Sequence, residues 1–319
     1  MRYDSHMDTP SELLRGLQLG EDGAQTQVDI PKLRRGAVDG TFFALYTAPE
    51  LHPDQATRHA LDMLAAVYDA LEAFPEQLAL ATSSSDAARN RAAGRISIFL
   101  GMENAAPIQE SLSLLRLFHH MGVRYVTLTH NGDNAVADSA AEGQRWGGLS
   151  PFGREVVREM NRLGMLVDLS HASDATFWDA LKTSQAPIVA THSCCRALCG
   201  HRRNLSDDML RALGERDGYV GINFYPHFLS EDPSQADVHT IADHIDHAVA
   251  LAGLSHVGIG SDYDGIEITP RGMENVSRLG VLEEELRRRG YAAAETELIM
   301  GGNLLAVLDR VAACSGELQ

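Results

Sequence analysis

The sequence lacks any run of about 18 apolar residues, the length that a helix needs to cross a lipid bilayer. It also lacks a basic surplus, because 44 Asp and Glu residues outnumber 27 Lys and Arg residues and give a net charge of −17. Nucleic acids and anionic membrane surfaces attract basic proteins, so this charge argues against both as partners. No Gly-rich dinucleotide-binding turn follows any of the segments that read as strands.

Cysteine is scarce, and three of the four cysteines are bunched: Cys194, Cys195, Cys199 and Cys314. This spacing is not typical of the disulfide framework of a secreted protein. The first ten residues, MRYDSHMDTP, contain no apolar segment of the kind that a signal peptide needs. A cytoplasmic location is the simplest expectation from these observations.

What the sequence does contain is an alternation of short β-branched apolar segments with amphipathic ones. The clearest unit spans residues 165–193, where MLVDLSH and PIVATHS read as strands. Between them, residues 174–184 read as a helix that starts with a capping residue, either Ser173 or Asp174. A strand–helix–strand unit of this length favours a parallel crossover, which brings His171 and His192 to the same edge of a sheet.

The same alternation extends along the whole chain. Eight segments read as strands, at residues 2–8, 40–47, 96–103, 123–130, 165–171, 187–193, 218–225 and 256–265. From the second strand onward, a helix is expected between consecutive strands, at residues 55–74, 108–121, 151–164, 174–184, 207–215 and 240–252. Eight such units predict an α/β fold, the TIM (β/α)8 barrel, with residues 1–319 as one domain that ends in C-terminal helices. A doubly wound open sheet is the structural alternative.

Side chains that bind metals or transfer protons stand at the ends of most of these strands: His6, Asp8, Glu103, His130, His171, His192 and Asp262. In a parallel barrel the carboxyl ends of the strands share one rim, where catalytic residues lie. Any one of these residues could be an ordinary loop or capping residue. Together they are hard to bury without a cation, because imidazoles and carboxylates would repel each other or stay unpaired. The pattern therefore predicts a metal site at the C-terminal ends of the strands.

The number of candidate ligands favours two ions over one. His6, Asp8, Glu103, His171 and His192 exceed the three protein ligands usual for a single catalytic zinc. A carboxylate such as Glu103 can bridge two ions about 3.5–4 Å apart. Nitrogen and oxygen ligands without thiolate indicate Zn²⁺ first, with Mn²⁺ or Co²⁺ as substitutes.

The motifs around these residues resemble the membrane (renal) dipeptidase family, a binuclear zinc branch of the amidohydrolase-like barrels. The matching segments extend over nearly the whole chain and include DSHMDTP, GMEN, GVRYVTLTHN, MLVDLSHASD, THSCCRALCGHRRNLSDD, GINFYPHFLS and HVGIGSDYDG. The resemblance implies that His6, Asp8 and Glu103 hold one zinc. It implies that Glu103, His171 and His192 hold the other.

The resemblance also implies roles for residues that do not bind metal. His130 is expected to face the substrate and the oxyanion, and Asp262 to transfer the proton. Arg203 and Tyr225 are expected to receive the substrate's carboxylate. The implied reaction is hydrolysis of a dipeptide with a free C-terminal carboxylate, D-residue C-termini included, by a hydroxide that bridges the two zinc ions. By analogy with the family, the protein can be a homodimer.

Two other functions stay open on the sequence. The chain has Ala135 and Val136 where the family commonly has Pro-Trp, and GMENAAP lacks the family's usual Gly-Gly after the glutamate. We expect these changes to alter the pocket near His130. The second possible function is therefore that of a related metal amidohydrolase, which acts on another amide, a β-lactam or a peptide-derived metabolite. A catalytically inactive binding barrel is the third possibility, and the intact ligand set argues against it.

Several other polar residues are expected to have no role in catalysis or metal binding. Asp264 is expected to be structural. His239, His244 and His247 lie near helical spacing among acidic residues, which favours a solvated helix face over a second metal site.

Overall fold

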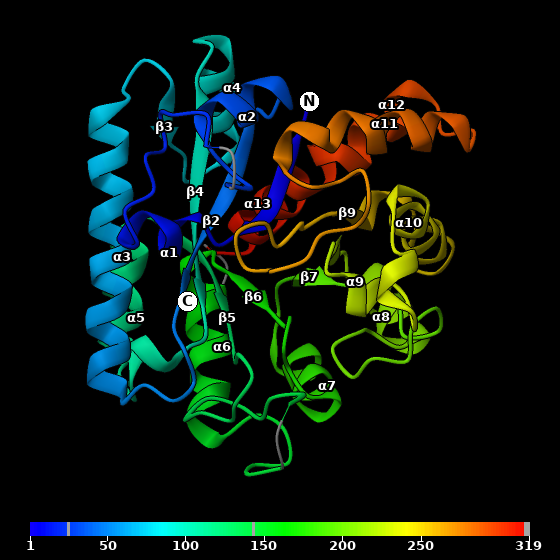
Figure 1. The fold of residues 1–319 in the computed structure, drawn as a ribbon. Helices are drawn as coiled ribbons and strands as arrows, with labels where there is room; N and C mark the ends of the chain where they lie inside the picture. Colours follow the sequence, from blue (N-terminus) through cyan, green and yellow to red (C-terminus); the bar gives the residue numbers. More distant parts are fainter. Residues whose placement is uncertain (24–25, 142–143, 316–319) are drawn as a thin grey trace.

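A computed structural model describes residues 1–23, 26–141 and 144–315 (Figure 1). Its parallel strands follow one another around a barrel in the order β1 (Tyr3–Met7), β2 (Gly40–Tyr46), β4 (Ile96–Glu103), β5 (Val123–Thr127), β6 (Leu166–Asp168), β7 (Ile188–Ser193), β8 (Tyr219–Ile222) and β9 (Val257–Ile259). The barrel closes where Met7 bridges Tyr263 in parallel and the amide of Asp262 donates to the carbonyl of His6 at 3.1 Å. The TIM barrel predicted from the sequence is therefore confirmed.

The helices that connect these strands lie around the barrel: α3 (Pro53–Ala73), α5 (Leu112–His120), α6 (Pro151–Leu163), α7 (Asp174–Thr183), α8 (Asp207–Glu215) and α10 (Val238–Ala252). Figure 1 shows α3 and α5 along one side of the barrel and α8 and α10 on the opposite side. Serine side chains accept backbone N–H groups at the starts of α6, α7 and α8, and of the two candidate caps of α7 it is Ser173 that does so. Gly164 ends α6 in the left-handed conformation, with a φ of 71°.

Several elements were not expected from the sequence. Between β1 and β2 lie two short helices, α1 (Thr9–Leu14) and α2 (Ile30–Arg35), and β3 (Leu78–Leu80) and α4 (Ser84–Ala92) lie between β2 and β4. β3 is three residues long, lies outside the path of the barrel and pairs with the first residues of β4. α4 is largely polar. Neither has the apolar periodicity by which the other elements are recognised. The short α9 (Pro226–Leu229) follows β8.

The tail is helical, as predicted, and consists of α11 (Leu279–Arg288), α12 (Ala293–Glu297) and α13 (Asn303–Cys314). Between α12 and α13 the backbone kinks at Gly301, within a wide turn at Leu298–Gly302. Single 3₁₀ turns complete the chain at Ala106–Ile108, Pro233–Gln235, Leu254–His256 and Val276–Arg278. Apolar residues of α13 pack with Tyr3, Leu166 and Tyr219, which begin their strands, so α13 covers the end of the barrel opposite the C-terminal rim.

The strands end earlier than the sequence suggested. β5, β6 and β9 stop at Thr127, Asp168 and Ile259, so His130, His171 and Asp262 each lie three residues beyond a strand. The φ angles of His171 and Asp262 are 69° and 66°, in the left-handed region that non-glycine residues rarely adopt. Within the described residues, no helix is both long and apolar enough to cross a membrane, and all four cysteines are free thiols.

Candidate active site

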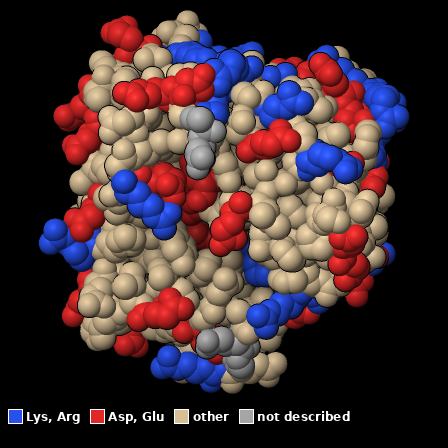
Figure 2. All heavy atoms as spheres, viewed as in Figure 1, with Lys and Arg blue, Asp and Glu red and all other residues tan. Residues whose placement is uncertain are grey.

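A cavity of about 770 Å³ opens at the C-terminal rim of the barrel. Figure 2 shows the hollow, with Asp and Glu side chains gathered in and around it. Six of the residues predicted for the site line the cavity: Asp8, Glu103, His130, His171, Tyr225 and Asp262. His6 and His192 are fully buried, and Arg203 is 5% exposed. The nine predicted site residues are therefore at one end of the barrel, six of them on the cavity wall.

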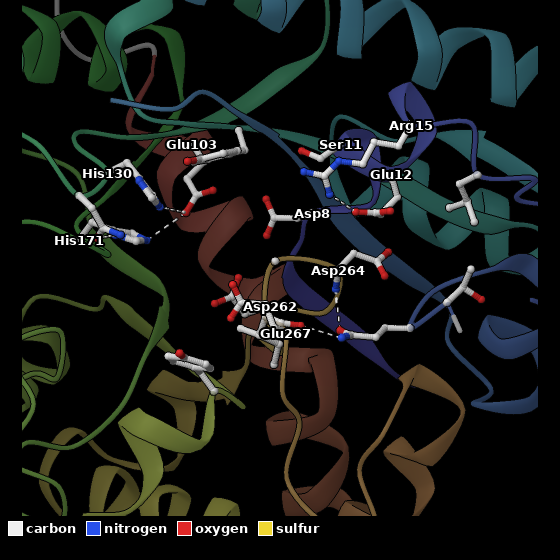
Figure 3. A pocket seen from close by; sticks show the side chains of 18 of the residues that line it. Asp8, Ser11, Glu12, Arg15, Glu103, His130, His171, Asp262, Asp264 and Glu267 are labelled. Atoms are coloured by element: carbon white, nitrogen blue, oxygen red, sulfur yellow. Dashed lines mark hydrogen bonds and ion pairs between the residues drawn. The ribbon is translucent and has the colours of Figure 1, made fainter. Parts of the chain in front are cut away.

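Glu103 is the centre of this site. Its Oε1 lies 3.0 Å from Nε2 of His171 and 3.4 Å from Nε2 of His192. Its other oxygen, Oε2, lies 3.7 Å from Nε2 of His6, and Nε2 of His130 stands 4.0 Å from Oε1. Figure 3 shows the side chains of His130 and His171 pointing toward Glu103 from the same side of the cavity. One carboxylate thus faces imidazoles from four strand ends.

A second group of ligand atoms adjoins the first. Nε2 of His6 lies 3.3 Å from Oδ2 of Asp8 and 3.8 Å from Oδ1 of Asp262. Three overlapping sets have ligand atoms all within 4.8 Å of one another: His6, Glu103 and His192; Glu103, His130 and His171; and His6, Asp8 and Asp262. The donors are imidazole nitrogens and carboxylate oxygens, which suit zinc and related divalent ions.

Hydrogen bonds orient the three buried imidazoles so that each Nε2 faces this cluster. Their Nδ1 atoms lie beside Tyr125 Oη for His6 (2.8 Å), Asn131 Oδ1 for His171 (2.9 Å) and Thr191 Oγ1 for His192 (2.9 Å). Thr191 in turn donates to Asp168 at 2.7 Å. Metal-binding histidines are typically held in this way, with the nitrogen away from the metal paired to a protein group. Sequence reasoning missed these supporting residues, although Asn131 and Thr191 are the direct neighbours of His130 and His192.

The charges in the cluster fit a bound cation. Burial lowers the pKa values of His130, His171 and His192, so these imidazoles are neutral and can bind metal. Burial and the nearby Glu103 carboxylate raise the pKa of Asp8 well above its usual range. Burial also acts to raise the pKa of Glu103, but the imidazoles of His6, His171 and His192 outweigh it and hold that pKa well below its usual range. Burial acts to lower the pKa of His6, but Glu103 and Asp8 outweigh it and raise that pKa well above its usual range. The carboxylates thus favour a positive charge at this place, which a bound cation can supply.

The buried Nε2 of His6 gives an independent test of this fit. Although Oδ2 of Asp8 lies 3.3 Å away, the two atoms do not have hydrogen-bond geometry, and this nitrogen makes no hydrogen bond among the residues that the structure describes. Buried polar atoms are nearly always paired. A metal ion at this nitrogen would satisfy it, and Asp8 and Glu103 stand close enough to share that ion. The residues present therefore fit a metal centre.

Gly265 sits where the carboxylates of Asp8 and Asp262 approach each other. A Cβ at this position would lie 2.2 Å from Oδ2 of Asp8 and 2.7 Å from Oδ1 of Asp262. We therefore expect Gly265→Ala to displace both carboxylates and to lower kcat/KM by about 100-fold or more, because a displacement of about 1 Å at a reacting group can cost that much.

Steady-state kinetics and metal content would measure this effect. Gly280→Ala, in α11, is the control, because a Cβ there meets nothing closer than 3.5 Å. Full activity in Gly265→Ala would contradict the close approach of the two carboxylates.

Asp262 is positioned by a neighbour that sequence reasoning also missed. Nδ2 of Asn223 donates to Oδ2 of Asp262 at 2.9 Å. Asn223 lies within the GINFY motif, but the motif alone does not indicate this contact. Asp264, which was expected to be structural, lines the cavity. Thr9 donates to its Oδ2 at 2.7 Å, and burial raises the pKa of Asp264 to about 7.

Arg203 lies behind the cavity wall. Its guanidinium donates to the carbonyl of His192 at 3.2 Å and stands 5.3 Å from the ring centroid of Phe228. Burial lowers the pKa of Arg203 to about 10, while the carboxylate of Asp262 opposes that shift. Tyr225 and Phe228 line the cavity in front of it. Arg203 is thus a buried cation one side chain away from the cavity.

Two expectations about loops and histidines differ from the structure. Val136 is packed in the core and Ala135 does not line the cavity, so the changed loop affects packing beneath the site rather than the pocket wall. His244 is fully buried instead of solvated, because its Nδ1 accepts the backbone N–H of Cys195 and its Nε2 faces the carbonyl of Leu229. His244 thus links the segment after β7 to the end of α9, a role that the spacing of histidines in the sequence does not indicate.

Comparisons with known proteins show which proteins this chain is similar to. The family model described as membrane dipeptidase (peptidase family M19) matches residues 2–319. Dipeptidase aclJ of Aspergillus oryzae is 41% identical over 295 residues, which are 89% of this chain and 70% of the relative. An uncharacterized dipeptidase of Schizosaccharomyces pombe is 38% identical over 323 residues, covering 95% of this chain and 79% of the relative. A metallo peptidase from Rhodobacter sphaeroides, solved with a phosphinate mimic of the dipeptide L-Ala-D-Ala, has a TM-score of 0.92 and 28% identity over 97% of this chain and 99% of its own.

Proposed function

The chain belongs to the membrane dipeptidase family, a family of metallopeptidases, and we propose that it hydrolyses dipeptides with a free C-terminal carboxylate by means of two zinc ions. The observation that carries this proposal is the convergence of His6, Asp8, Glu103, His171 and His192 on one buried cluster below the cavity. Five nitrogen and oxygen ligands, one of them a central carboxylate, are typical of two-metal hydrolases.

In this proposal His6, Asp8 and Glu103 hold one ion, and Glu103, His171 and His192 hold the other. Both oxygens of Glu103 face imidazoles, Oε1 toward His171 and His192 and Oε2 toward His6, which supports a bridging role. When bound, such ions polarise a carbonyl and lower the pKa of water to near neutrality. Mn²⁺ or Co²⁺ can take the place of Zn²⁺ with these donors.

Asp262 is the proposed proton-transfer residue. Asn223 holds its Oδ2, and its Oδ1 faces His6 at the edge of the cluster. From this place the carboxylate can accept a proton from the attacking water and deliver it to the leaving amine. His130, whose pKa burial lowers, is a neutral imidazole that can donate an N–H to the developing oxyanion.

The carboxylate of the substrate is proposed to bind near Arg203 and Tyr225. The guanidinium of Arg203 is a charged fork in a buried site, and it would gain a strong partner in a carboxylate that enters from the cavity. The Rhodobacter relative was solved with a mimic of a dipeptide that ends in D-Ala. Dipeptides with D-residue C-termini are therefore included among the proposed substrates.

Arg203→Lys should raise KM by about tenfold or more with a smaller change in kcat, because a lysine ammonium cannot reproduce the two-pronged contact of guanidinium with a carboxylate. The measurement compares dipeptides with their C-terminal amides. Wild type should prefer the free acids, and the variant should lose most of that preference. Arg202→Lys is the matched control, since Arg202 is an exposed neighbour that bonds the carbonyl of Ala141. An unchanged preference in Arg203→Lys would contradict the assigned contact.

A panel of dipeptides with L- and D-residue C-termini tests the function itself, with metal content measured on the same sample. We expect turnover of some members of the panel and none of their C-terminal amides. Hydrolysis of a β-lactam or another amide without turnover of any dipeptide would favour a related amidohydrolase. No turnover of any substrate by zinc-loaded protein would favour an inactive binding barrel.

A further inference from the structure

We infer that Gln27 is a positioning residue for Asp262, an assignment that rests on the proposed role of Asp262 in the reaction. Gln27 lies between α1 and α2, more than 230 residues before the loop that carries Asp262. Its side chain crosses to that loop at the wall of the cavity. Neither its position nor its residue type marks it in the sequence.

Both ends of the Gln27 side-chain amide are used in this contact. The backbone N–H of Asp264 donates to Oε1 of Gln27 at 2.8 Å, and Nε2 of Gln27 donates to the carbonyl of Ile266 at 2.7 Å. A flipped amide would place donor against donor and acceptor against acceptor, so the orientation is determined. The side-chain amide of Gln27 therefore bonds the backbone on both sides of Gly265, through one N–H and one carbonyl.

The loop from Asp262 to Ile266 needs such support. It continues beyond the end of β9, and both Asp262 and Asp264 have left-handed backbone conformations, with φ angles of 66° and 68°. Strained backbone of this kind persists only where the surroundings hold it. Gly265 lies between these contacts, where an added Cβ would collide with the carboxylates of Asp8 and Asp262. Because Asp262 belongs to this loop, a shift of the loop would move the reacting carboxylate. Figure 3 shows Asp262, Asp264 and Glu267 together on this side of the cavity.

The backbone around Gln27 is held in place by hydrogen bonds. Its carbonyl accepts the backbone N–H of Val276 at 3.1 Å. Next to it, Thr26 donates to Oδ2 of Asp29 at 2.7 Å, and the ammonium of Lys32 donates to Thr26 at 2.8 Å. Asp29 is fully buried and caps α2. A side chain anchored in this way can impose a position on the loop that it contacts.

Gln27→Met tests the assignment, because methionine keeps the length of the side chain and removes both hydrogen bonds. We expect kcat for a dipeptide to fall about tenfold with KM within about twofold of wild type, since misplacement of a proton-transfer group slows the reaction more than it weakens binding. Metal content and melting temperature should stay unchanged. Gln27→Glu keeps an acceptor for the amide of Asp264 and should recover part of kcat. Gln18→Met is the matched control, because Gln18 is exposed and its side chain bonds only Gly16 among the described residues.

Hydrogen exchange of the Asp264 amide gives a readout that does not depend on activity. It should be faster in Gln27→Met than in wild type and unchanged in Gln18→Met. Unchanged kcat in Gln27→Met, or a change confined to KM, would overturn the assignment, the latter because Gln27 would then act on the substrate. Unchanged exchange at Asp264 would also overturn it. If wild-type protein hydrolyses no dipeptide, the proposed function fails, while the exchange result still decides whether Gln27 holds the loop.

Discussion

Asp262→Asn should lower kcat by about 10²–10⁴-fold, the range that a positioned general acid or base contributes. The amide keeps the shape of the side chain, and its oxygen can still accept the N–H of Asn223, so the loop should stay in place. What the variant loses is the ability to take a proton from water and return it to the leaving amine. Metal content should equal that of wild type, because Asp262 is not among the five proposed ligands.

Asp264→Asn is the control for this result. Asp264 also lines the cavity and belongs to the same loop, but its carboxylate is bonded by Thr9 and it lies outside the ligand cluster. We expect this variant to keep most of its activity. A nearly active Asp262→Asn variant, or an inactive Asp264→Asn variant with wild-type Asp262, would assign the proton to a different carboxylate.

Glu103→Gln should have the largest effect on metal binding. Loss of a residue that only supports a ligand weakens metal binding by about 10–100-fold, and Glu103 stands within 4 Å of four imidazole nitrogens at the centre of the cluster. An amide cannot supply two anionic oxygens to two ions. We therefore expect the purified variant to contain less metal than wild type and to have no measurable activity.

Metal analysis and circular dichroism together test that expectation. The control variant is Glu110→Gln, an exposed residue seven positions later in the chain, which should have wild-type metal content. Folded Glu103→Gln protein with two ions per chain would contradict a bridging role for Glu103.

The position of the site could be predicted from the sequence because the strands of the barrel are parallel. Residues 96–103 are an example. The predicted strand coincides with β4, and Glu103 ends it at the rim. Because all strands of the barrel are parallel, His6, His171 and His192 had to reach the same rim once the barrel was recognised. Charged and imidazole side chains at the ends of apolar segments can be recognised as candidate site residues, because burying them without a partner is costly.

The residues that orient the ligands could not be recognised in the same way. Asn131, Asn223 and Gln27 are neutral amides, which are common in any loop, and each acts through a partner that is distant in the chain. Tyr125 reads as an ordinary strand residue until the barrel places its hydroxyl beside His6. Their roles depend on tertiary geometry, which the local pattern of a segment does not contain.

Metal-free protein titrated with Zn²⁺ while dipeptide hydrolysis is followed tests the central proposal most directly. The account predicts no activity without metal, activity that rises with added zinc, and saturation at two ions per chain. The account would be contradicted if activity were already maximal at one ion per chain. It would also be contradicted if protein with two bound ions cleaved no dipeptide with a free carboxylate.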